Sequence, residues 1–491
     1  MTRLNFALQM MPLAVAAALL SGCANLAPDY QRPPLPVPQQ YERGVLPGSV
    51  PPGAQWRGYF TDPRLQQLIA QALESNRDLR VAVSRVAQAR AAYGIQSADQ
   101  LPTLGVAASG QRSLVPADLN LTQRPLHANQ YQAGIGLPSW ELDFWGRVQN
   151  LSEAALQNYL ASEAARDAAT TALIGQVVFS YLDLCDSEQR ITLARRTLAS
   201  RQQSFDMMSR RANVGSASQL QLTQVETLLI QARALVLQLE QDRDTQQHAL
   251  ALLVGAPIAW PAGGEHTAHG EALVAPTASP WTLSLPIPAP GLPSALLTHR
   301  PDIVAAEHKL QAANANIGVA RAAYFPQISL TGSFGSASAE LDGLFKSGSR
   351  AWSYGPSISL PLFDAGRRRA LQTLAEARRD EALAAYDKTV QSAFRDVADA
   401  LSALHWLDQQ QQVAIEAVRV QGQRARLSQL RYDSGASSYL DVLDAQRDLL
   451  SAEQQQVRAQ HAVQAARVSL YLALGGASPA IQSPVTSGPH P

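Results

Sequence analysis

The sequence predicts a mainly α-helical protein that carries a membrane β-barrel and is built from an internal two-fold repeat. Two proline-free stretches of 66 residues, 147–212 and 367–432, predict one long helix in each half. At about 1.5 Å per residue, each helix would be about 100 Å long. Apolar residues spaced by three and four form a seam along the second stretch, from Leu383 to Leu404. Helices of this length must pack along other long helices, because an ordinary globular core cannot cover them.

The spacing of glycines establishes the repeat. Three pairs are each separated by 220 residues: Gly146 and Gly366, Gly215 and Gly435, and Gly255 and Gly475. The segment Leu-Asp-Phe-Trp-Gly-Arg at 142–147 also corresponds to Leu-Phe-Asp-Ala-Gly-Arg at 362–367. Such repetition indicates that each half is the same structural unit. We therefore divide the chain into repeat 1 (65–255), an equatorial linker rich in Pro and Gly (256–292), repeat 2 (293–476) and a flexible tail (477–491).

Composition and missing motifs argue against several functions. The 491 residues carry 40 Lys+Arg and 40 Asp+Glu, and this neutral balance does not favour a nucleic-acid partner. Neither a phosphate-binding glycine loop nor a nucleophile elbow occurs, and the nine histidines are scattered. His266 and His269 lie in the linker without the cysteine or carboxylate pattern of a metal site. We predict no enzyme activity, no metal and no dissociable cofactor.

The N-terminus predicts export and lipidation. Arg3 and the apolar run 6–20 are typical of a secretory signal peptide, which we assign to 1–22. The run ends in Leu-Ser-Gly-Cys, which resembles the bacterial lipoprotein cleavage box and predicts a covalent lipid on Cys23. The alternative is an ordinary signal peptide with a chance cysteine. The proline-rich, lipid-anchored segment 23–64 should be extended, and Cys185 should be a small packing residue.

Shorter helices accompany each long one. Residues 65–98 and 219–254 predict helices of 34 and 36 residues, and together these are about as long as the long helix. We infer that the two short helices meet end to end beside the long one. Repeat 2 has the same arrangement, with helices predicted at 294–324 and 439–474.

Each repeat also carries one predicted β-hairpin between a short and a long helix. Strands are predicted in four segments: 104–108, 131–137, 327–334 and 353–360. The hairpins extend over about 103–142 and 327–362, with polar loops at 111–130 and 337–352. Strands of about ten residues match the length needed to cross a membrane.

Four strands are too few to close a membrane barrel. Small barrels need about eight strands, and an open edge in lipid leaves backbone groups unpaired. Two copies of the chain would supply eight strands, but a barrel of that size is filled by its own side chains. The prediction is therefore an assembly of at least three copies.

Several motifs together resemble the TolC-like outer membrane factors, in the lipoprotein branch of that family. The motifs lie at 297–303 (Leu-Thr-His-Arg-Pro-Asp-Ile), 141–147 (Glu-Leu-Asp-Phe-Trp-Gly-Arg) and 439–446 (Tyr-Leu-Asp-Val-Leu-Asp-Ala-Gln). The resemblance covers Trp56 to Gly476. It implies a homotrimer with a 12-stranded barrel in the outer membrane and a 12-helix α-barrel across the periplasm. It also implies a periplasmic adaptor protein and an inner-membrane pump of the RND type as partners.

The resemblance further implies a gate at the periplasmic tip. Asp441, Asp444 and Tyr432 match gate positions, and carboxylates crowded by threefold symmetry would repel one another and attract cations. An alternative for Asp441 is a helix-capping role with Ser438. Arg447 could pair with Asp444, although an exposed pair of that kind contributes little to stability.

The turns at the tips are the candidate adaptor-docking sites. They contain Val214 and Gly215 in repeat 1, and Gly435, Ala436 and Ser437 in repeat 2. Glycine at their centres permits the positive φ that ends a helix. A tight turn with no further role is the alternative. Some family members carry a basic residue at the position of Ser437, so a latch between helices must differ in this chain.

These features predict an outer membrane exit duct of a tripartite efflux pump. It would be anchored in outer membrane lipid, extend into the periplasm and passively export small toxic compounds. One alternative is an exit duct for type I protein secretion. Another is a structural lipoprotein that spans the envelope, although such a spacer would have no use for the alternating hairpins.

Overall fold

The computed structural model describes residues 25–38, 41, 55–258, 260, 285–287 and 300–476. The predicted signal peptide, Cys23, most of the equatorial linker and the C-terminal tail lie outside these residues. The chain forms two compact units, which we describe separately. The sheet unit comprises Met1–Pro34, Arg85–Glu163 and Ala305–Asp387, and the tip unit comprises Leu35–Ser84, Ala164–Val304 and Lys388–Pro491.

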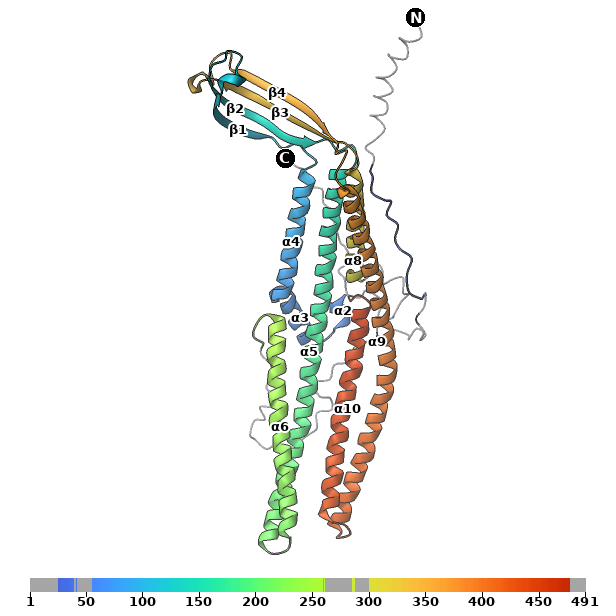
Figure 1. The fold of residues 1–491 in the computed structure, drawn as a ribbon. Helices are drawn as coiled ribbons and strands as arrows, with labels where there is room; N and C mark the ends of the chain where they lie inside the picture. Colours follow the sequence, from blue (N-terminus) through green and yellow to red (C-terminus); the bar gives the residue numbers. More distant parts are fainter. Residues whose placement is uncertain are drawn as a thin grey trace. The chain divides into compact units, whose positions relative to one another are not determined.

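A four-stranded antiparallel sheet, in the order β1-β2-β3-β4, dominates the sheet unit (Figure 1). Its strands are β1 (Gly105–Val115), β2 (Leu126–Glu141), β3 (Gln327–Ser338) and β4 (Arg350–Ser359). Each repeat supplies one hairpin, and β2 pairs with β3 to join the repeats. The strands are longer than the sequence indicates, because polar residues assigned to the loops, such as Gln111 and Gln130, pair across the ladder. Short 3-10 turns at Ala117–Leu119 and Leu341–Gly343 lie in the loops.

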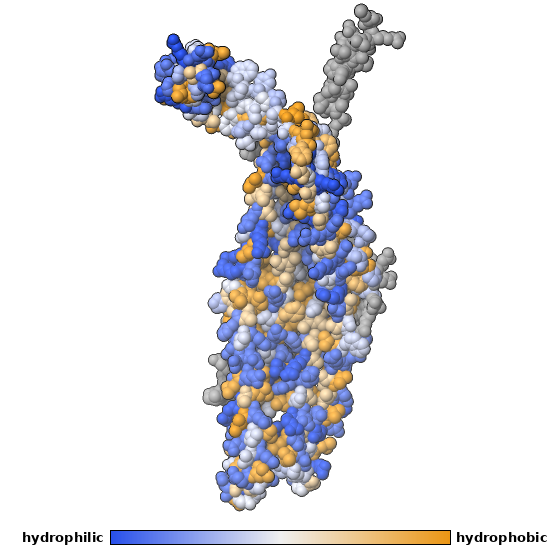
Figure 2. Space-filling view, viewed as in Figure 1, coloured by the Kyte–Doolittle hydropathy of each residue, from blue (hydrophilic) through white to orange (hydrophobic). Residues whose placement is uncertain are grey.

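The two faces of this sheet differ in side-chain character. Residues directly opposite on neighbouring strands share a face, and one row across all four strands is Val106, Ile135, Phe334 and Trp352. Tyr354 and Ile358 continue this apolar face, and all six side chains are exposed in the single chain. The neighbouring row, on the opposite small-residue face, is Ala107, Gly134, Gly335 and Ala351. Much of the sheet is pale in Figure 2, which reflects its content of Gly, Ser and Ala.

Two long helices run through both units. They are α5 (Arg147–Asn213) and α9 (Arg367–Asp433), each of 67 residues, and they end within one residue of the predicted positions. Proline-free sequence explains their continuity, since an internal proline would break the hydrogen-bond ladder. An apolar stretch of α5 is long enough to cross a membrane, but half of it is buried in the structure, as in the core helix of a soluble protein.

The shorter helices match the prediction except at a break at Asn76 and at the start of the helix expected at 294–324. They are α2 (Trp56–Tyr59), α3 (Pro63–Ser75), α4 (Arg77–Ala98), α6 (Gln219–Val254), α8 (Pro301–Ala322) and α10 (Tyr439–Ala473). The helix expected at 294–324 begins at Pro301, and 294–299 lie outside the described residues. The single helix expected at 65–98 is divided at Asn76, which is extended. Asn76 Oδ1 accepts a hydrogen bond from Leu79 N at 2.9 Å, and Nδ2 donates to Leu253 O at 2.8 Å. The asparagine therefore starts α4 and holds the end of α6 beside it.

The main core of the tip unit surrounds the middle of α5. Leu65 and Ile69 of α3 pack there with Val177 and Val178 of α5, and Tyr59 stacks on Tyr471 with ring centroids 4.2 Å apart. Cys185 is a free, buried thiol in this core, and burial raises its pKa to about 12. The predicted packing role of Cys185 is confirmed.

An extended strap at residues 25–32 lies along α8 in the sheet unit. Arg32 forms a bidentate ion pair with Glu307, with both N–O distances 2.8 Å. Asn314 Nδ2 donates to Pro28 O at 2.7 Å, and Asn150 Nδ2 donates to Asn25 Oδ1 at 2.8 Å. A Cβ added to Gly318 would lie 2.8 Å from the nitrogen of Ala27. The absence of a side chain at Gly318 therefore lets the strap approach the helix.

Candidate gate at the helical tip and lipid-facing sheet

The tip unit ends in two helical hairpins of similar geometry, α5–α6 and α9–α10 (Figure 1). Gly215 and Gly435 both have φ +75°, which strongly favours glycine. In the first turn, Gly215 N donates to Ala212 O at 3.0 Å and Ser216 N to Arg211 O at 2.9 Å. The second turn repeats this pattern with Gly435, Ala436 and their partners at 2.9 and 2.8 Å. The repeated glycines thus close both helices in the same way.

The predicted docking residues are presented at these turns. Val214, Gly215, Gly435 and Ala436 are exposed, and Ser437 is partly buried. Val214 is 79% exposed. The tips therefore offer small and apolar groups to a contacting surface.

Asp441 and Asp444 both lie in the first turns of α10, and each has a partner. The carboxylate of Asp441 accepts a hydrogen bond from Ser438 N at 3.2 Å, the contact expected of its capping alternative. Asp444 lies 3.3 Å from Arg447. Arg447 is also 3.3 Å from Asp448, which in turn pairs with Arg424 at 2.6 Å. Both gate candidates reach solvent, with Asp441 exposed and Asp444 at 43% side-chain exposure.

Tyr432 connects three of the four tip helices. Its hydroxyl accepts a hydrogen bond from Arg211 Nη1 of α5, and its ring lies 4.9 Å from that of Tyr439 at the start of α10. The Arg211 guanidinium also lies 5.8 Å from the Tyr432 ring centroid. Sequence reasoning identified Tyr432 but missed Arg211. The available signal was a basic residue in the last turn of α5.

A small apolar cluster lies next to these polar contacts. It comprises Met208, Val225, Tyr439, Val442 and Leu443, all buried and drawn from α5, α6 and α10. Burial of side chains of this size contributes about 1.5–3 kcal/mol each. The cluster therefore favours the packed arrangement of the two hairpins.

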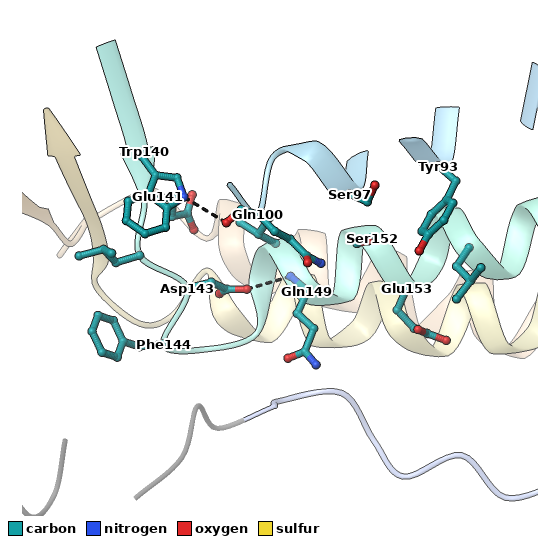
Figure 3. Close-up of a pocket in the computed structure, with 13 residues that line it drawn as sticks. Tyr93, Ser97, Gln100, Trp140, Glu141, Asp143, Phe144, Gln149, Ser152 and Glu153 are labelled. Carbon is teal, nitrogen blue, oxygen red and sulfur yellow. Dashed lines mark hydrogen bonds between the residues drawn. The ribbon is translucent and has the colours of Figure 1, made fainter. Parts of the chain in front are cut away.

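In the sheet unit, the repeated motif before each long helix converts a strand into that helix. Asp143 Oδ1 accepts from Arg147 N at 2.7 Å. Asp143 Oδ2 accepts from Gln149 N at 2.8 Å (Figure 3). Gly146 has φ +69°. In repeat 2, Asp364 caps α9 through Arg368 N at 3.1 Å, and Gly366 has φ +88°. The sequence matches at 142–147 and 362–367 therefore encode a turn and a helix cap.

A cleft of about 620 Å³ lies beside this first turn of α5. Tyr93 of α4, Trp140 of β2 and Phe144 line it together with Glu153 (Figure 3). Trp140 Nε1 donates to Gln100 O at 3.2 Å. Among the described residues, no cluster of three or more His, Cys, Asp or Glu could hold a metal ion.

Comparison with known proteins identifies relatives among outer membrane efflux proteins. The family described as outer membrane efflux protein matches residues 68–256 and 292–476. Outer membrane protein OprJ of Pseudomonas aeruginosa is 42% identical over 470 residues, which is 94% of this chain and 95% of OprJ. The toluene efflux pump outer membrane protein TtgI of Pseudomonas putida is 41% identical over 476 residues, which is 94% of this chain and 97% of TtgI.

A solved structure agrees with these relatives. The open state of the Neisseria gonorrhoeae MtrE outer membrane channel matches with TM-score 0.81 and 38% identity, covering 92% of this chain and 98% of MtrE. The chain is thus an outer membrane channel protein of an efflux system. It belongs to the outer membrane efflux protein family, and the predicted family resemblance and location are confirmed.

Proposed function

We propose that three copies of this chain form a passive, lipid-anchored exit duct. The duct would have a 12-stranded barrel in the outer membrane, a 12-helix barrel in the periplasm and a gate at the tip. The observation that carries the proposal is the sheet, whose two faces differ in character and whose two edge strands, β1 and β4, have no partner within the described chain.

The sheet supports closure between copies. In lipid, an unpaired strand edge costs several kcal/mol for each unsatisfied backbone group. Pairing β1 of one copy with β4 of the next removes every edge. The apolar face, with Trp352 at 65% exposure and Tyr354 at 72%, would then contact lipid. The small-residue face would line the lumen, where short side chains leave room for passage.

The helices of the tip unit support the same assembly. On α9, Trp406, Val413, Val420 and Leu427 recur every seven residues, and all are between 46% and 70% exposed. On α6, Leu220, Ile230 and Leu237 are exposed while Val225, Leu229 and Val236 are buried on the opposite side. In the tip unit, α5 and α10 lie between α6 and α9 (Figure 1). We assign the cover of α9 to α6 of the neighbouring copy, in the manner of a coiled-coil seam.

We base the proposed membrane anchor on the strap of the sheet unit, and the proposed adaptor contact on the turns of the tip unit. A lipid on Cys23 would be separated only by Ala24 from the strap that begins at Asn25, so the docked strap would fix where the anchor attaches. The tips at Val214, Gly215, Gly435, Ala436 and Ser437 would bind a periplasmic adaptor. The sequence carries no nucleotide-binding motif, so we assign energy input to an inner-membrane pump of the RND type. We propose no enzymatic activity and no cofactor beyond the lipid.

The proposed cargo is small toxic compounds. The relative TtgI is named for toluene efflux, and its similarity over almost the full length supports small molecules over polypeptides. We assign Tyr432, Asp441 and Asp444 to the gate because they lie at the tip, beside the turn that joins α9 to α10.

Purified protein tests the assembly and the duct together. Native mass measurement in detergent should give three chains, each carrying lipid on Cys23, and planar bilayers should show discrete conductance steps. The matched control is Cys23→Ser, which should lose the lipid and keep the channel once reconstituted. A single-chain particle, or a trimer that never conducts, would contradict the duct.

A further inference from the structure

Arg201 of α5 is a buried cation at the contact between the two tip hairpins. Its residue exposure is 3%. Nη1 donates to Gln446 Oε1 at 3.0 Å, and Nη2 is 3.4 Å from Leu443 O, so both acceptors are neutral groups of α10. None of the ion pairs found in the described part of the chain includes Arg201. Burial lowers the pKa of its guanidinium, because removal from water disfavours the charged form.

The carboxylates of α10 nearest in sequence to Gln446 are engaged with other arginines. Asp444 pairs with Arg447 at 3.3 Å. Asp448 pairs with Arg424 at 2.6 Å and with Arg447 at 3.3 Å. The position facing Arg201 is therefore an amide where a carboxylate would complete an ion pair. Gln446 satisfies part of the hydrogen bonding of the guanidinium but none of its charge.

The buried charge of Arg201 destabilises the packed arrangement of the two hairpins. Removing an ion from water carries a penalty that neutral hydrogen bonds only partly offset. Met208, Val442 and Leu443 gain from burial in the same contact between α5 and α10. Separation of the two hairpins would return the guanidinium to water. The charge on Arg201 therefore favours the separated state, while the apolar cluster favours the packed state.

We propose that Arg201 is a positioning residue of the gate, whose uncompensated charge biases the α9–α10 hairpin to move away from α5. This inference rests on the proposed function, since it assigns a direction to the gate described there. It differs from the simpler view in which Arg201 ties the hairpins together through its two hydrogen bonds. The two views predict opposite effects of removing the charge.

Spin labels at the tips distinguish these views without measuring transport. Val214→Cys and Ala436→Cys place labels on the exposed turns of the two hairpins, and the buried Cys185 should not react. Labelled copies diluted with unlabelled ones give the distance between hairpins within one copy. Arg201→Met removes the charge and keeps the apolar volume, and Gln446→Glu supplies the missing carboxylate. Gln203→Met, at an exposed position of the same helix, is the matched control.

Both Arg201→Met and Gln446→Glu should reduce the fraction of the long-distance, separated state by about fivefold, a typical size for coupling between sites. Gln203→Met should leave it unchanged. An increase in the separated state with Arg201→Met would establish Arg201 as a tie and overturn the proposal. A change in melting temperature with an unchanged distance distribution would also overturn it, because that result indicates a structural role alone. Conductance of the unlabelled wild type is measured in parallel, so failure of the duct itself is recognised separately.

Discussion

The sheet and the tip encode their roles in different ways. In the sheet, a row such as Val106, Ile135, Phe334 and Trp352 acts through its common apolar character, and the ladder is held by backbone hydrogen bonds. At the tip, single side chains make specific contacts, as between Arg211 and Tyr432 or Ser438 and Asp441. The proposed barrel should therefore tolerate substitutions that preserve the character of a face. The proposed gate should respond to the loss of a single hydrogen bond or charge.

The largest expected effect comes from placing a charge on either face of the sheet. Phe334→Arg puts a cation on the apolar face, where an arginine in lipid costs up to about 2–4 kcal/mol near the bilayer midplane. Ser333→Arg, one residue away, places the same charge on the small-residue face. We expect Phe334→Arg to lower the amount of protein in the outer membrane fraction sharply. Ser333→Arg should insert normally and reduce cation conductance.

Equal loss of inserted protein in both arginine variants would contradict the assignment of the faces. Phe334→Leu is the control for size and shape, because it keeps the apolar character of the position. It should insert like the wild type.

A second large effect is expected where the strands approach closely. Gly134 and Gly335 are paired across β2 and β3, and a Cβ at Gly134 would lie 2.5 Å from Phe334 O. Gly134→Val should therefore prevent normal pairing and lower the yield of assembled protein, measured by heat-dependent mobility on gels. Gly332→Ala is the matched control, because its Cβ would meet its nearest neighbour at an ordinary 3.6 Å. Normal assembly of Gly134→Val would show that this contact relaxes easily.

Much of this architecture could be predicted because it depends on local sequence. Long helices follow from periodic, proline-free sequence, and the turns at Gly215 and Gly435 follow from their need for positive φ. The break at Asn76 could not be predicted, because its stability depends on a hydrogen bond to Leu253, which is distant in sequence. Arg211 and Arg201 were missed for the same reason: their partners, Tyr432 and Gln446, lie more than 200 residues away.

The extent of the strands was predicted less well than their existence. Polar residues such as Gln111, Asn129 and Gln130 led us to assign 111–115 and 126–130 to a loop, although every residue of these segments is paired in the ladder. An antiparallel ladder depends on backbone groups, so polar side chains do not end it. The alternation of side-chain types at the centre of each strand therefore predicted the strand correctly, whereas the polarity of the residues at its ends did not predict where the strand ends.

A moderate effect is expected from the tip aspartates. In Asp441→Asn with Asp444→Asn the two charges are removed, while an amide oxygen at 441 can still accept from Ser438 N. We expect a higher single-channel conductance or a weaker block by divalent cations, because the proposed ring of like charges would no longer attract them. Asp441→Ala with Asp444→Ala should show the same electrical change with an additional loss of stability of about 1 kcal/mol from the cap. Unchanged traces in both double variants would remove these residues from the gate.

The smallest expected effect is a change in stability from a pH-dependent contact between α5 and α10. His461 Nε2 lies 2.9 Å from Asp183 Oδ1, and this contact raises the pKa of His461 above its ordinary value of 6.5, with Asp186 acting in the same direction. Because the folded state binds the proton more tightly, the stabilisation is complete below the unfolded pKa and is lost as pH rises through the folded pKa. His461→Gln should therefore lower the melting temperature at pH 5.5 and have little effect at pH 8.5. The pair is partly exposed, so its contribution should stay below about 1 kcal/mol. A larger loss at pH 8.5 than at pH 5.5 would show that the neutral imidazole is the stabilising form.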